Sequence, residues 1–196
     1  MPRFEIPGED EIRALVARIV DVMQEGPAAE APSGPATEVS DALESAIAVG
    51  ADHGGFRLKE RIAFRLREQG HQVVDCGTDS PDSVDYPDLA LAVAEKVSSG
   101  ECRWGIVVDG AGIGSSMVAN KVPGVRAALC YDVSSARNSR EHNHANVLTL
   151  GAGLVGESLA LQIVEAWLET PWGEGRHARR VDMIDGIDKK YARNTA

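Results

Sequence analysis

Residues able to move protons or to bind an anion follow the short apolar runs of this sequence. Asp52 and His53 come directly after the run at 46–51, and two glycines follow them. A carboxylate beside an imidazole can exchange a proton with a hydroxyl group, and the imidazole can contact a phosphate. The alternative is an aspartate that caps a helix beside a histidine with no part in chemistry.

A glycine-rich stretch follows the apolar run at 104–108. It reads Asp109-Gly110-Ala111-Gly112-Ile113-Gly114-Ser115-Ser116. Alternating glycines that lead into a helix expose backbone N–H groups, which can hold an anion or a developing oxyanion. The stretch is not a dinucleotide-binding motif, because that motif has a different glycine spacing and follows the first strand of its fold. A tight structural turn is the alternative interpretation.

Two further polar groups lie nearer the C-terminus. His142 and Asn143 stand at a predicted junction from helix to strand, and Arg176, His177 and Arg180 stand at the entrance to the last predicted helix. Arginines four residues apart share one face of a helix and can bind phosphate oxygens bidentately. For each group the alternative is a solvated run of polar side chains. The four candidates together describe one pocket that is equipped to isomerise a sugar phosphate.

Alternating apolar and amphipathic segments from residue 46 onward must position these side chains. Strands are predicted at 46–51, 72–76, 104–108, 126–130 and 147–150, and helices at 56–69, 86–99, 133–141, 157–169 and 181–191, with a short helix from the glycine loop to residue 121. This alternation predicts an α/β fold of the Rossmann-like, doubly wound type, with a five-stranded parallel sheet between two helical layers (α/β/α). Sites in such sheets lie beyond the carboxyl ends of the strands, so all four candidates are expected at that edge.

Charge and cysteine content exclude several classes of function. The net charge of −10 in 196 residues is uneven, because ten of the 30 acidic residues but three of the 20 basic ones lie in 1–45. A nucleic-acid-binding surface needs a clustered basic face, and no apolar run approaches the ~18 residues that span a bilayer. Cys76, Cys102 and Cys130 are too widely spaced for a disulfide framework or a metal site, and no secretory signal is apparent. We therefore expect a cytoplasmic protein with reduced thiols and with no nucleic-acid or membrane partner.

Seven ordered motifs from about residue 45 to residue 191 carry a resemblance to a known family. They are A-D-H-G-G-F at 51–56, D-Y-P at 85–87, G-x-G-I-G at 110–114, A-N-K-V-P-G-V-R-A-A at 119–128, S-R-E-H-N at 139–143, A-W-L at 166–168 and G-R-H-x-x-R at 175–180. In these motifs the sequence resembles the family of ribose-5-phosphate isomerase B and galactose-6-phosphate isomerase. The resemblance implies interconversion of aldose and ketose phosphates through an enediolate, without a metal or an organic cofactor.

The resemblance also implies roles for single residues. Asp52 and His142 would assist ring opening and proton handling. His53, Arg176 and Arg180 would hold the phosphate, with His177 nearby. Tyr86 and Asn143 would contact the sugar, and the amides of Gly110, Gly112 and Gly114 would stabilise the enediolate, within a substrate-binding loop that includes Ala111 and Ser115. Sites of this family form at subunit interfaces, which implies a homodimer or homotetramer.

The sequence departs from the family pattern in the glycine loop. Asp109 replaces the cysteine that acts as base, Ala111 replaces a threonine, and Ser115 stands where some members carry a glutamate base. A carboxylate is a competent base in principle, so the expected reaction is interconversion of ribose 5-phosphate and ribulose 5-phosphate with Asp109 as the base. One alternative is a hexose 6-phosphate, because Gly153 replaces a frequent arginine and leaves room. The other is a non-catalytic sugar-phosphate-binding subunit that pairs with a cysteine-bearing homologue.

An extension precedes the region of resemblance. Residues 9–25 place Ile12, Leu15, Val16, Ile19, Val20 and Met23 at helical spacing, and 26–45 are rich in Pro, Ala, Gly and Ser. We therefore divide the chain into a helical extension (1–25), a linker (26–45) and an isomerase domain (46–196). The extension resembles the encapsulation peptides of bacterial microcompartments, which implies a shell protein as partner and a location inside the compartment. The alternative is docking on the protein's own body or in an oligomer.

Overall fold

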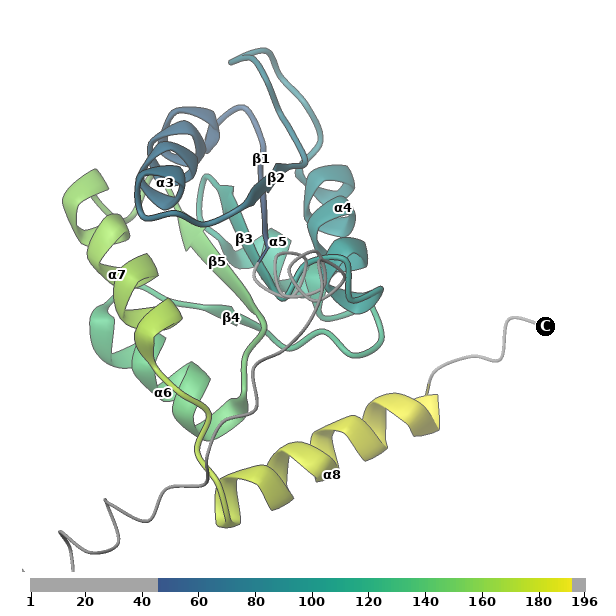
Figure 1. The fold of residues 1–196 in the computed structure, drawn as a ribbon. Helices are drawn as coiled ribbons and strands as arrows, with labels where there is room; N and C mark the ends of the chain where they lie inside the picture. Colours follow the sequence, from purple (N-terminus) through teal and green to yellow (C-terminus); the bar gives the residue numbers. More distant parts are fainter. Residues whose placement is uncertain (1–45, 192–196) are drawn as a thin grey trace, which may run out of the picture. The chain divides into compact units, whose positions relative to one another are not determined.

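The computed structural model describes residues 46–191, which form an α/β body around one parallel sheet (Figure 1). The predicted extension at 1–25 and linker at 26–45 lie outside the described residues. The sheet has the order β2-β1-β3-β5-β4, and every pair of neighbours is parallel. Its strands are β1 (Ile47–Ala51), β2 (Val73–Asp75), β3 (Trp104–Asp109), β4 (Ala127–Leu129) and β5 (Val147–Gly151).

Helices cover both faces of the sheet, as the sequence predicts for a doubly wound fold. They are α3 (Phe56–Glu68), α4 (Tyr86–Ser98), α5 (Ile113–Ala119), α6 (Val133–Asn143), α7 (Glu157–Glu169) and α8 (Arg176–Tyr191). Buried side chains of α3, α6 and α7 pack on one face of the sheet, and those of α4 and α5 pack on the other. The predicted fold class is therefore confirmed.

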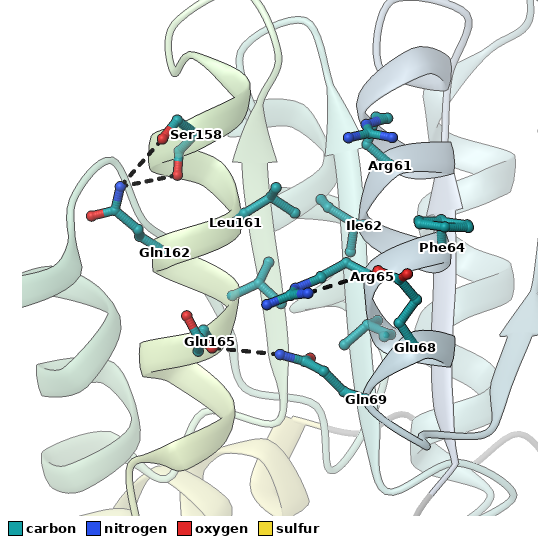
Figure 2. Close-up of a pocket in the computed structure, with 12 residues that line it drawn as sticks. Arg61, Ile62, Phe64, Arg65, Glu68, Gln69, Ser158, Leu161, Gln162 and Glu165 are labelled. Atoms are coloured by element: carbon teal, nitrogen blue, oxygen red, sulfur yellow. Dashed lines mark hydrogen bonds and ion pairs between the residues drawn. The ribbon is translucent and has the colours of Figure 1, made fainter.

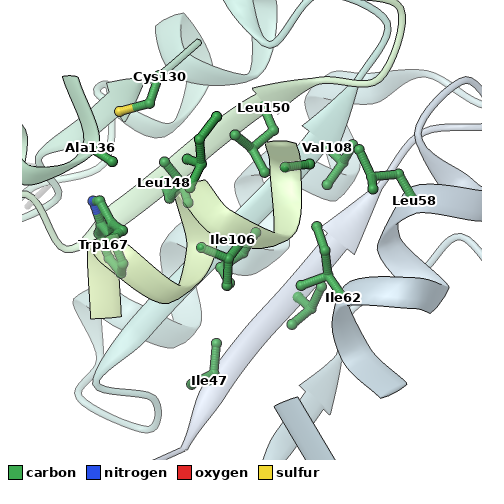
Figure 3. Packing of buried hydrophobic residues seen from close by; sticks show 14 of the residues in the cluster. Ile47, Leu58, Ile62, Ile106, Val108, Cys130, Ala136, Leu148, Leu150 and Trp167 are labelled. Atoms are coloured by element: carbon green, nitrogen blue, oxygen red, sulfur yellow. The ribbon is translucent and has the colours of Figure 1, made fainter. Parts of the chain in front are cut away.

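The central strands are buried on both sides because their side chains alternate between the two helical layers. In β3, Trp104, Ile106 and Val108 join the cluster under α3 and α7, whereas Val107 joins the cluster under α4 and α5. Figure 3 shows the first cluster, to which the fully buried Trp167 of α7 belongs together with Ile106 of β3 and Leu148 of β5. This rigid sheet fixes the positions at which the loops leave it.

Three element bounds differ from the sequence prediction in ways that concern the candidate residues. Helix α6 ends at Asn143, two residues after the predicted end, so His142 and Asn143 belong to its last turn. Strand β3 extends to Asp109, so this carboxylate belongs to the end of the strand and is 5% exposed. Helix α8 begins at Arg176, five residues before the predicted start, because Gly175 with φ of +63° makes the turn that precedes it. Arg176, His177 and Arg180 therefore lie within the first turns of α8.

Helix α8 is anchored on the body mainly by polar contacts. Asp185 pairs with Arg126 at 2.9 Å, and Asp188 accepts a hydrogen bond from the backbone N–H of Gly124 at 2.8 Å. Val181 is the buried residue of this helix, whereas Met183 and Ile187 are each 60% exposed. None of the helices described between residues 46 and 191 is long and apolar enough to cross a membrane.

Candidate active site

The carboxyl ends of β1 and β3 form the point at which chain connections leave the sheet toward opposite faces. Ala51 pairs with Val108 in the register of these strands, and α3 then covers one face while α5 covers the other. Divergent connections of this kind open a crevice in which ligands of doubly wound sheets bind. Asp52 and the glycine loop leave the sheet at this crevice, and a Cβ on Gly54 would lie 3.3 Å from Asp52 Oδ1 and 3.7 Å from the backbone nitrogen of Gly110.

Asp52 and His53 are fixed by backbone groups. Asp52 is buried, and its Oδ1 accepts a hydrogen bond from the N–H of Gly55 at 2.9 Å, just before α3 begins. Asp52 is not the N-cap of α3, because Gly55 occupies that position and has no side-chain cap, so the capping alternative is wrong; the bond from Gly55 lies in the turn before the helix and engages one oxygen of the carboxylate. His53 is exposed, and its Nδ1 lies 3.3 Å from both the nitrogen and the oxygen of Val84.

The Asp109 carboxylate is turned into its own glycine loop. Its Oδ1 accepts hydrogen bonds from the N–H of Ala111 at 2.7 Å and from the N–H of Gly112. Its Oδ2 accepts hydrogen bonds from the N–H of Ser115 at 3.0 Å and from the Ser115 hydroxyl, which is fully buried. These four hydrogen bonds to one carboxylate stabilise the loop in the conformation observed.

This arrangement divides the amides expected to stabilise an oxyanion. The N–H of Gly112 points at Asp109 and is occupied, whereas the N–H groups of Gly110 and Gly114 have no hydrogen-bond partner among residues 46–191. Gly114 is required by packing, because a Cβ there would lie 2.6 Å from the ring of Tyr86. Two free amides, the Asp52 carboxylate and the Tyr86 ring therefore gather at this crevice.

The other five candidates form a second group, to which α6 and α8 both contribute. The rings of His142 and His177 stack at 4.2 Å with an angle of 6° between their planes, and Arg176 Nε lies 3.4 Å from His177 Nε2. Asn138 contacts His142 Nδ1 at 2.9 Å and accepts a longer contact from the Asn143 amide at 3.4 Å. Arg180 lies in the next turn of α8 from Arg176 and is exposed.

The second group favours neutral histidine and an anionic ligand. Loss of solvent around His177, together with the neighbouring His142 and Arg176, lowers the pKa of His177 below its ordinary value of 6.5. Its Nδ1 is buried and has no hydrogen-bond partner among the described residues. Two arginines beside this pair supply positive charge that a phosphate can neutralise.

Within one chain the two groups lie at opposite edges of the sheet, so the expectation that all candidates share the carboxyl edge is wrong. Helix α6 runs from the carboxyl end of β4 to the amino end of β5, which places its C-terminal His142 at the amino edge. Asp109 ends β3 and Trp104 begins it, and Trp172 of the connection to α8 packs on Trp104 at 5.8 Å. The six residues of β3 therefore separate the groups by about 16 Å.

A buried arginine to which the sequence analysis assigns no role lies at the amino edge, two residues before His142. Arg140 is 3% exposed, and its guanidinium carbon lies 3.8 Å from the ring centre of Trp104, 4.8 Å from that of Trp167 and 5.5 Å from that of Trp172. It donates hydrogen bonds to the carbonyl oxygens of Trp167 at 3.1 Å and Ala145 at 2.8 Å. Burial lowers the pKa of Arg140 to about 10, so the group stays charged at neutral pH.

The connection from α7 to α8 is bound to the end of α6 by backbone and ring contacts. His144 Nε2 lies 2.7 Å from the carbonyl oxygen of Gly173, and the N–H of Gly173 donates to the carbonyl oxygen of Glu141 at 2.9 Å. The ring of His144 also stacks on Trp172 at 4.9 Å. These contacts bring the start of α8 against the end of α6, and so bring His177 onto His142.

Neither the cysteines nor the groove between α3 and α7 adds to these groups. Burial raises the pKa of Cys76 to about 11 and also raises the pKa values of Cys102 and Cys130, so their thiols are protonated at neutral pH. Figure 2 shows the groove, a cavity of about 370 Å³ with Arg61 and Glu165 on opposite sides. It contains none of the candidate residues, and among residues 46–191 no cluster of three side chains suited to hold a metal ion is found.

The comparisons with known proteins bear on the family and the fold of the chain. The model of the Ribose/Galactose Isomerase family matches residues 47–184. Ribose-5-phosphate isomerase B of Escherichia coli K12 is 46% identical over 144 residues, which cover 74% of this chain and 97% of that protein. The protein of the same name from Mycobacterium tuberculosis H37Rv is 41% identical over 149 residues, which cover 74% of this chain and 91% of that protein.

Solved structures give the same result. Ribose-5-phosphate isomerase B of Clostridium thermocellum matches with a TM-score of 0.74 at 54% identity, covering 75% of this chain and 99% of that one. The enzyme of Mycoplasma genitalium, solved with bound ribulose-5-phosphate, matches with a TM-score of 0.72 at 39% identity, covering 74% of this chain and 97% of that one. The fold, the ordered motifs and these matches agree, and the chain belongs to the ribose/galactose isomerase family.

Proposed function

We propose that this chain interconverts ribose 5-phosphate and ribulose 5-phosphate through an enediolate. The observation that carries the proposal is that the two polar groups contain different chemical equipment. The carboxyl-edge group holds a carboxylate and free amides for proton transfer and oxyanion binding, whereas the amino-edge group holds paired histidines and arginines for phosphate. Relatives over nearly their whole length are named as ribose-5-phosphate isomerases, and one was solved with ribulose-5-phosphate.

The proposed site needs two protomers, because one chain keeps its two groups about 16 Å apart. In a homodimer, as the basic unit of either a dimer or a tetramer, the amino-edge group of one protomer would complete the carboxyl-edge group of its partner. Exposed apolar side chains of α5 and α8 are available for this contact: Ile113 is 46% exposed, Met117 63% and Ile187 60%. Exposed apolar patches of this kind are typical of surfaces that bind another protein.

In the proposed reaction Asp52 and the partner subunit's His142 open the sugar ring by exchanging a proton between the ring oxygen and the anomeric hydroxyl. A base then removes the proton from C2, and the electron pair moves onto the carbonyl oxygen of C1 to give the enediolate. The N–H groups of Gly110 and Gly114 stabilise that oxygen. Transfer of the C2 hydroxyl proton to the C1 oxygen and return of the abstracted proton to C1 complete the reaction. C2 is thereby oxidised to the ketone as C1 is reduced to the alcohol, and no cofactor is consumed.

Asp109 is the proposed base, and it must exchange one of its present hydrogen bonds for the substrate proton. Replacement by asparagine removes the base. It also places an amide NH₂ group where a carboxylate oxygen now accepts hydrogen bonds from the loop. We expect Asp109→Asn to lower kcat by about 10²–10⁴-fold, as loss of a general base does. Turnover of ribose 5-phosphate by the purified full chain, with Asp109→Cys as the matched variant that restores a thiol base, tests the role. Full turnover in a folded Asp109→Asn variant would refute it.

The engaged carboxylate also favours a second candidate function, a sugar-phosphate-binding subunit whose base comes from a cysteine-bearing homologue. In that case the full chain binds ribose 5-phosphate in calorimetry but turns it over only after the homologue is added. Turnover of ribose 5-phosphate by the purified chain alone would exclude this second candidate function.

The choice of sugar rests on Gly153, which donates its N–H to the carbonyl oxygen of Gly110 at 3.0 Å. A Cβ there would lie 2.9 Å from that backbone oxygen, so position 153 approaches the glycine loop closely and places no side chain beside it. A hexose 6-phosphate is the alternative substrate, and the ratio of kcat/KM for the two sugar phosphates decides between them.

For the extension we propose an encapsulation role, with residues 9–25 as the contact to a microcompartment shell protein and the cytoplasmic compartment as the location. The support is the helical apolar stripe followed by a flexible linker composition. Deletion of 1–41 is expected to leave turnover unchanged and to abolish co-purification with shell protein. A large loss of turnover or melting temperature would favour docking on the body instead.

A further inference from the structure

Of the lysines between residues 46 and 191, Lys59 of α3 is the buried one, with 1% of its side chain exposed. Its Nζ lies 2.8 Å from both carboxylate oxygens of Asp75, 2.8 Å from the carbonyl oxygen of Thr78 and 2.9 Å from Glu60 Oε1. A buried ammonium group is costly unless it is fully paired, and these partners satisfy it. The position of the partners shows what the pairing holds in place.

Two of these partners fix the start of the segment 76–85, which connects β2 to α4 and forms the long loop between them in Figure 1. Asp75 also accepts a hydrogen bond from the N–H of Gly77 at 2.9 Å. Thr78 is buried and donates its N–H to the carbonyl oxygen of Ala51 at 2.8 Å, while Ala51 donates to Gly77 at 2.7 Å. The start of the segment is thereby joined to the end of β1, one residue before Asp52.

The far end of the same segment leads into the proposed site. Val84 contacts His53 Nδ1 through both its nitrogen and its oxygen at 3.3 Å. Tyr86 is the first residue of α4, and its ring occupies the space that a side chain on Gly114 would need. The segment 76–85 therefore lies between Lys59 and the two side chains proposed to contact phosphate and sugar.

We propose that Lys59 is a positioning residue for substrate binding: through Asp75 and Thr78 it fixes the segment 76–85, and this segment places His53 and Tyr86. The inference rests on the proposed function for the identity of the substrate. Lys59 itself touches no reacting atom. Its polar contacts beyond its own helix all go to this segment and to the strand end before it, whereas the apolar packing of α3 depends on Leu58, Ile62 and Leu66.

The first test is steady-state kinetics of the full chain with ribose 5-phosphate. Lys59→Met retains an unbranched apolar stem but leaves Asp75 and Thr78 without their donor. We expect KM to rise by about 10-fold or more with kcat changed by less than about 3-fold, because the lost interaction is one of ground-state binding and placement. Lys59→Arg restores a cation and is expected to recover part of the KM change.

Lys96→Met is the matched control, since it removes a lysine that pairs with Glu101 at 2.6 Å on an exposed part of α4. It is expected to leave KM unchanged. An equal rise of KM in Lys96→Met, or an unchanged KM in Lys59→Met, overturns the proposal.

The second test is amide hydrogen exchange, which does not depend on the reaction. In Lys59→Met we expect faster exchange in the segment 76–85 and unchanged exchange in α7 and β5. Faster exchange throughout residues 46–191 would show a general loss of stability and overturn the positioning role, as would unchanged exchange in the segment. If the segment loosens as expected but the unmodified chain does not turn over ribose 5-phosphate, the proposed function fails while the fixing of the segment by Lys59 stands.

Discussion

The two polar groups of this molecule are held by different means. At the carboxyl edge, Asp52 and Asp109 are buried and bonded to backbone N–H groups within six residues of themselves. At the amino edge, His142 and His177 come from two helices and are held by ring stacking, with their arginine neighbours exposed. The first group is complete in one chain, whereas the second presents its donors outward and lacks an acceptor for them. In the proposed site, one half is therefore preorganised within a single chain, and the other half needs a ligand and a second protomer.

The largest expected effect is on turnover, when each half of the proposed site is inactivated in a different chain. Asp109→Asn disables one half, and the double variant Arg176→Ala/Arg180→Ala disables the other, so each alone is expected to lose about 10³-fold in kcat/KM. Co-expression gives mixed dimers, each with one intact site, and should restore about one quarter of the normal activity. The measurement is turnover of the co-purified mixture. Activity no higher than the sum of the two variants would mean that the halves do not meet across an interface.

An intermediate effect is expected at Arg140, which supports only the amino-edge half. Arg140→Met leaves the carbonyl oxygens of Trp167 and Ala145 without a donor and removes the cation from three aromatic rings. We expect a loss of about 3 kcal/mol in the free energy of unfolding, measured by urea denaturation. Arg103→Met is the control, since this exposed arginine lies over the same Trp104 ring at 4.8 Å, and it should change stability by less than about 0.5 kcal/mol. Equal losses in the two variants would remove the special role of Arg140.

The smallest expected effect is a pH dependence at His177. Its pKa in the folded chain lies below the 6.5 of the unfolded chain, so below pH 6.5 the unfolded chain binds more protons. The folded chain is therefore expected to lose stability as pH falls below 6.5, until the lowered pKa is passed. Melting temperatures of the full chain and of His177→Gln between pH 7 and pH 5 measure this contribution. A chain and a variant that lose stability in parallel would show that His177 makes no such contribution.

Most of the fold was predictable from the sequence, because strand and helix periodicity is local. The bounds of α7 agree with the prediction, and the central strands differ from it by one residue at an end. The start of α8 was missed because the polar run from Arg176 to Arg180 carries no apolar period. A helix whose first turn is charged, as in α8, begins at a point set by the backbone turn before it, and the polar residues of that turn do not predict this point.

The candidate residues can be named from the sequence, but how the chain arranges them is a separate question. A residue at a junction from helix to strand lies at the amino edge of a parallel sheet, and this rule separates His142 from Asp109. The sequence predicts Asp109 as a base because it replaces the cysteine base of the family. Its four hydrogen bonds could not be predicted, because they depend on how the glycine loop folds back onto the carboxylate. The contacts that single out Arg140 and Lys59 join residues 16 to 36 positions apart, and no local sequence pattern contains them.

The three tryptophan rings around the Arg140 guanidinium have a spectroscopic consequence. The sequence has three tryptophans, and all three lie around this one guanidinium at the amino edge of the sheet. Trp172, which is 44% exposed, stacks on His144 beside the start of α8. Intrinsic tryptophan emission of the whole chain is therefore a label-free signal from the half that carries the arginines, and it is silent for the half that carries Asp109. A titration with inorganic phosphate can be followed at one end of the sheet without any introduced probe.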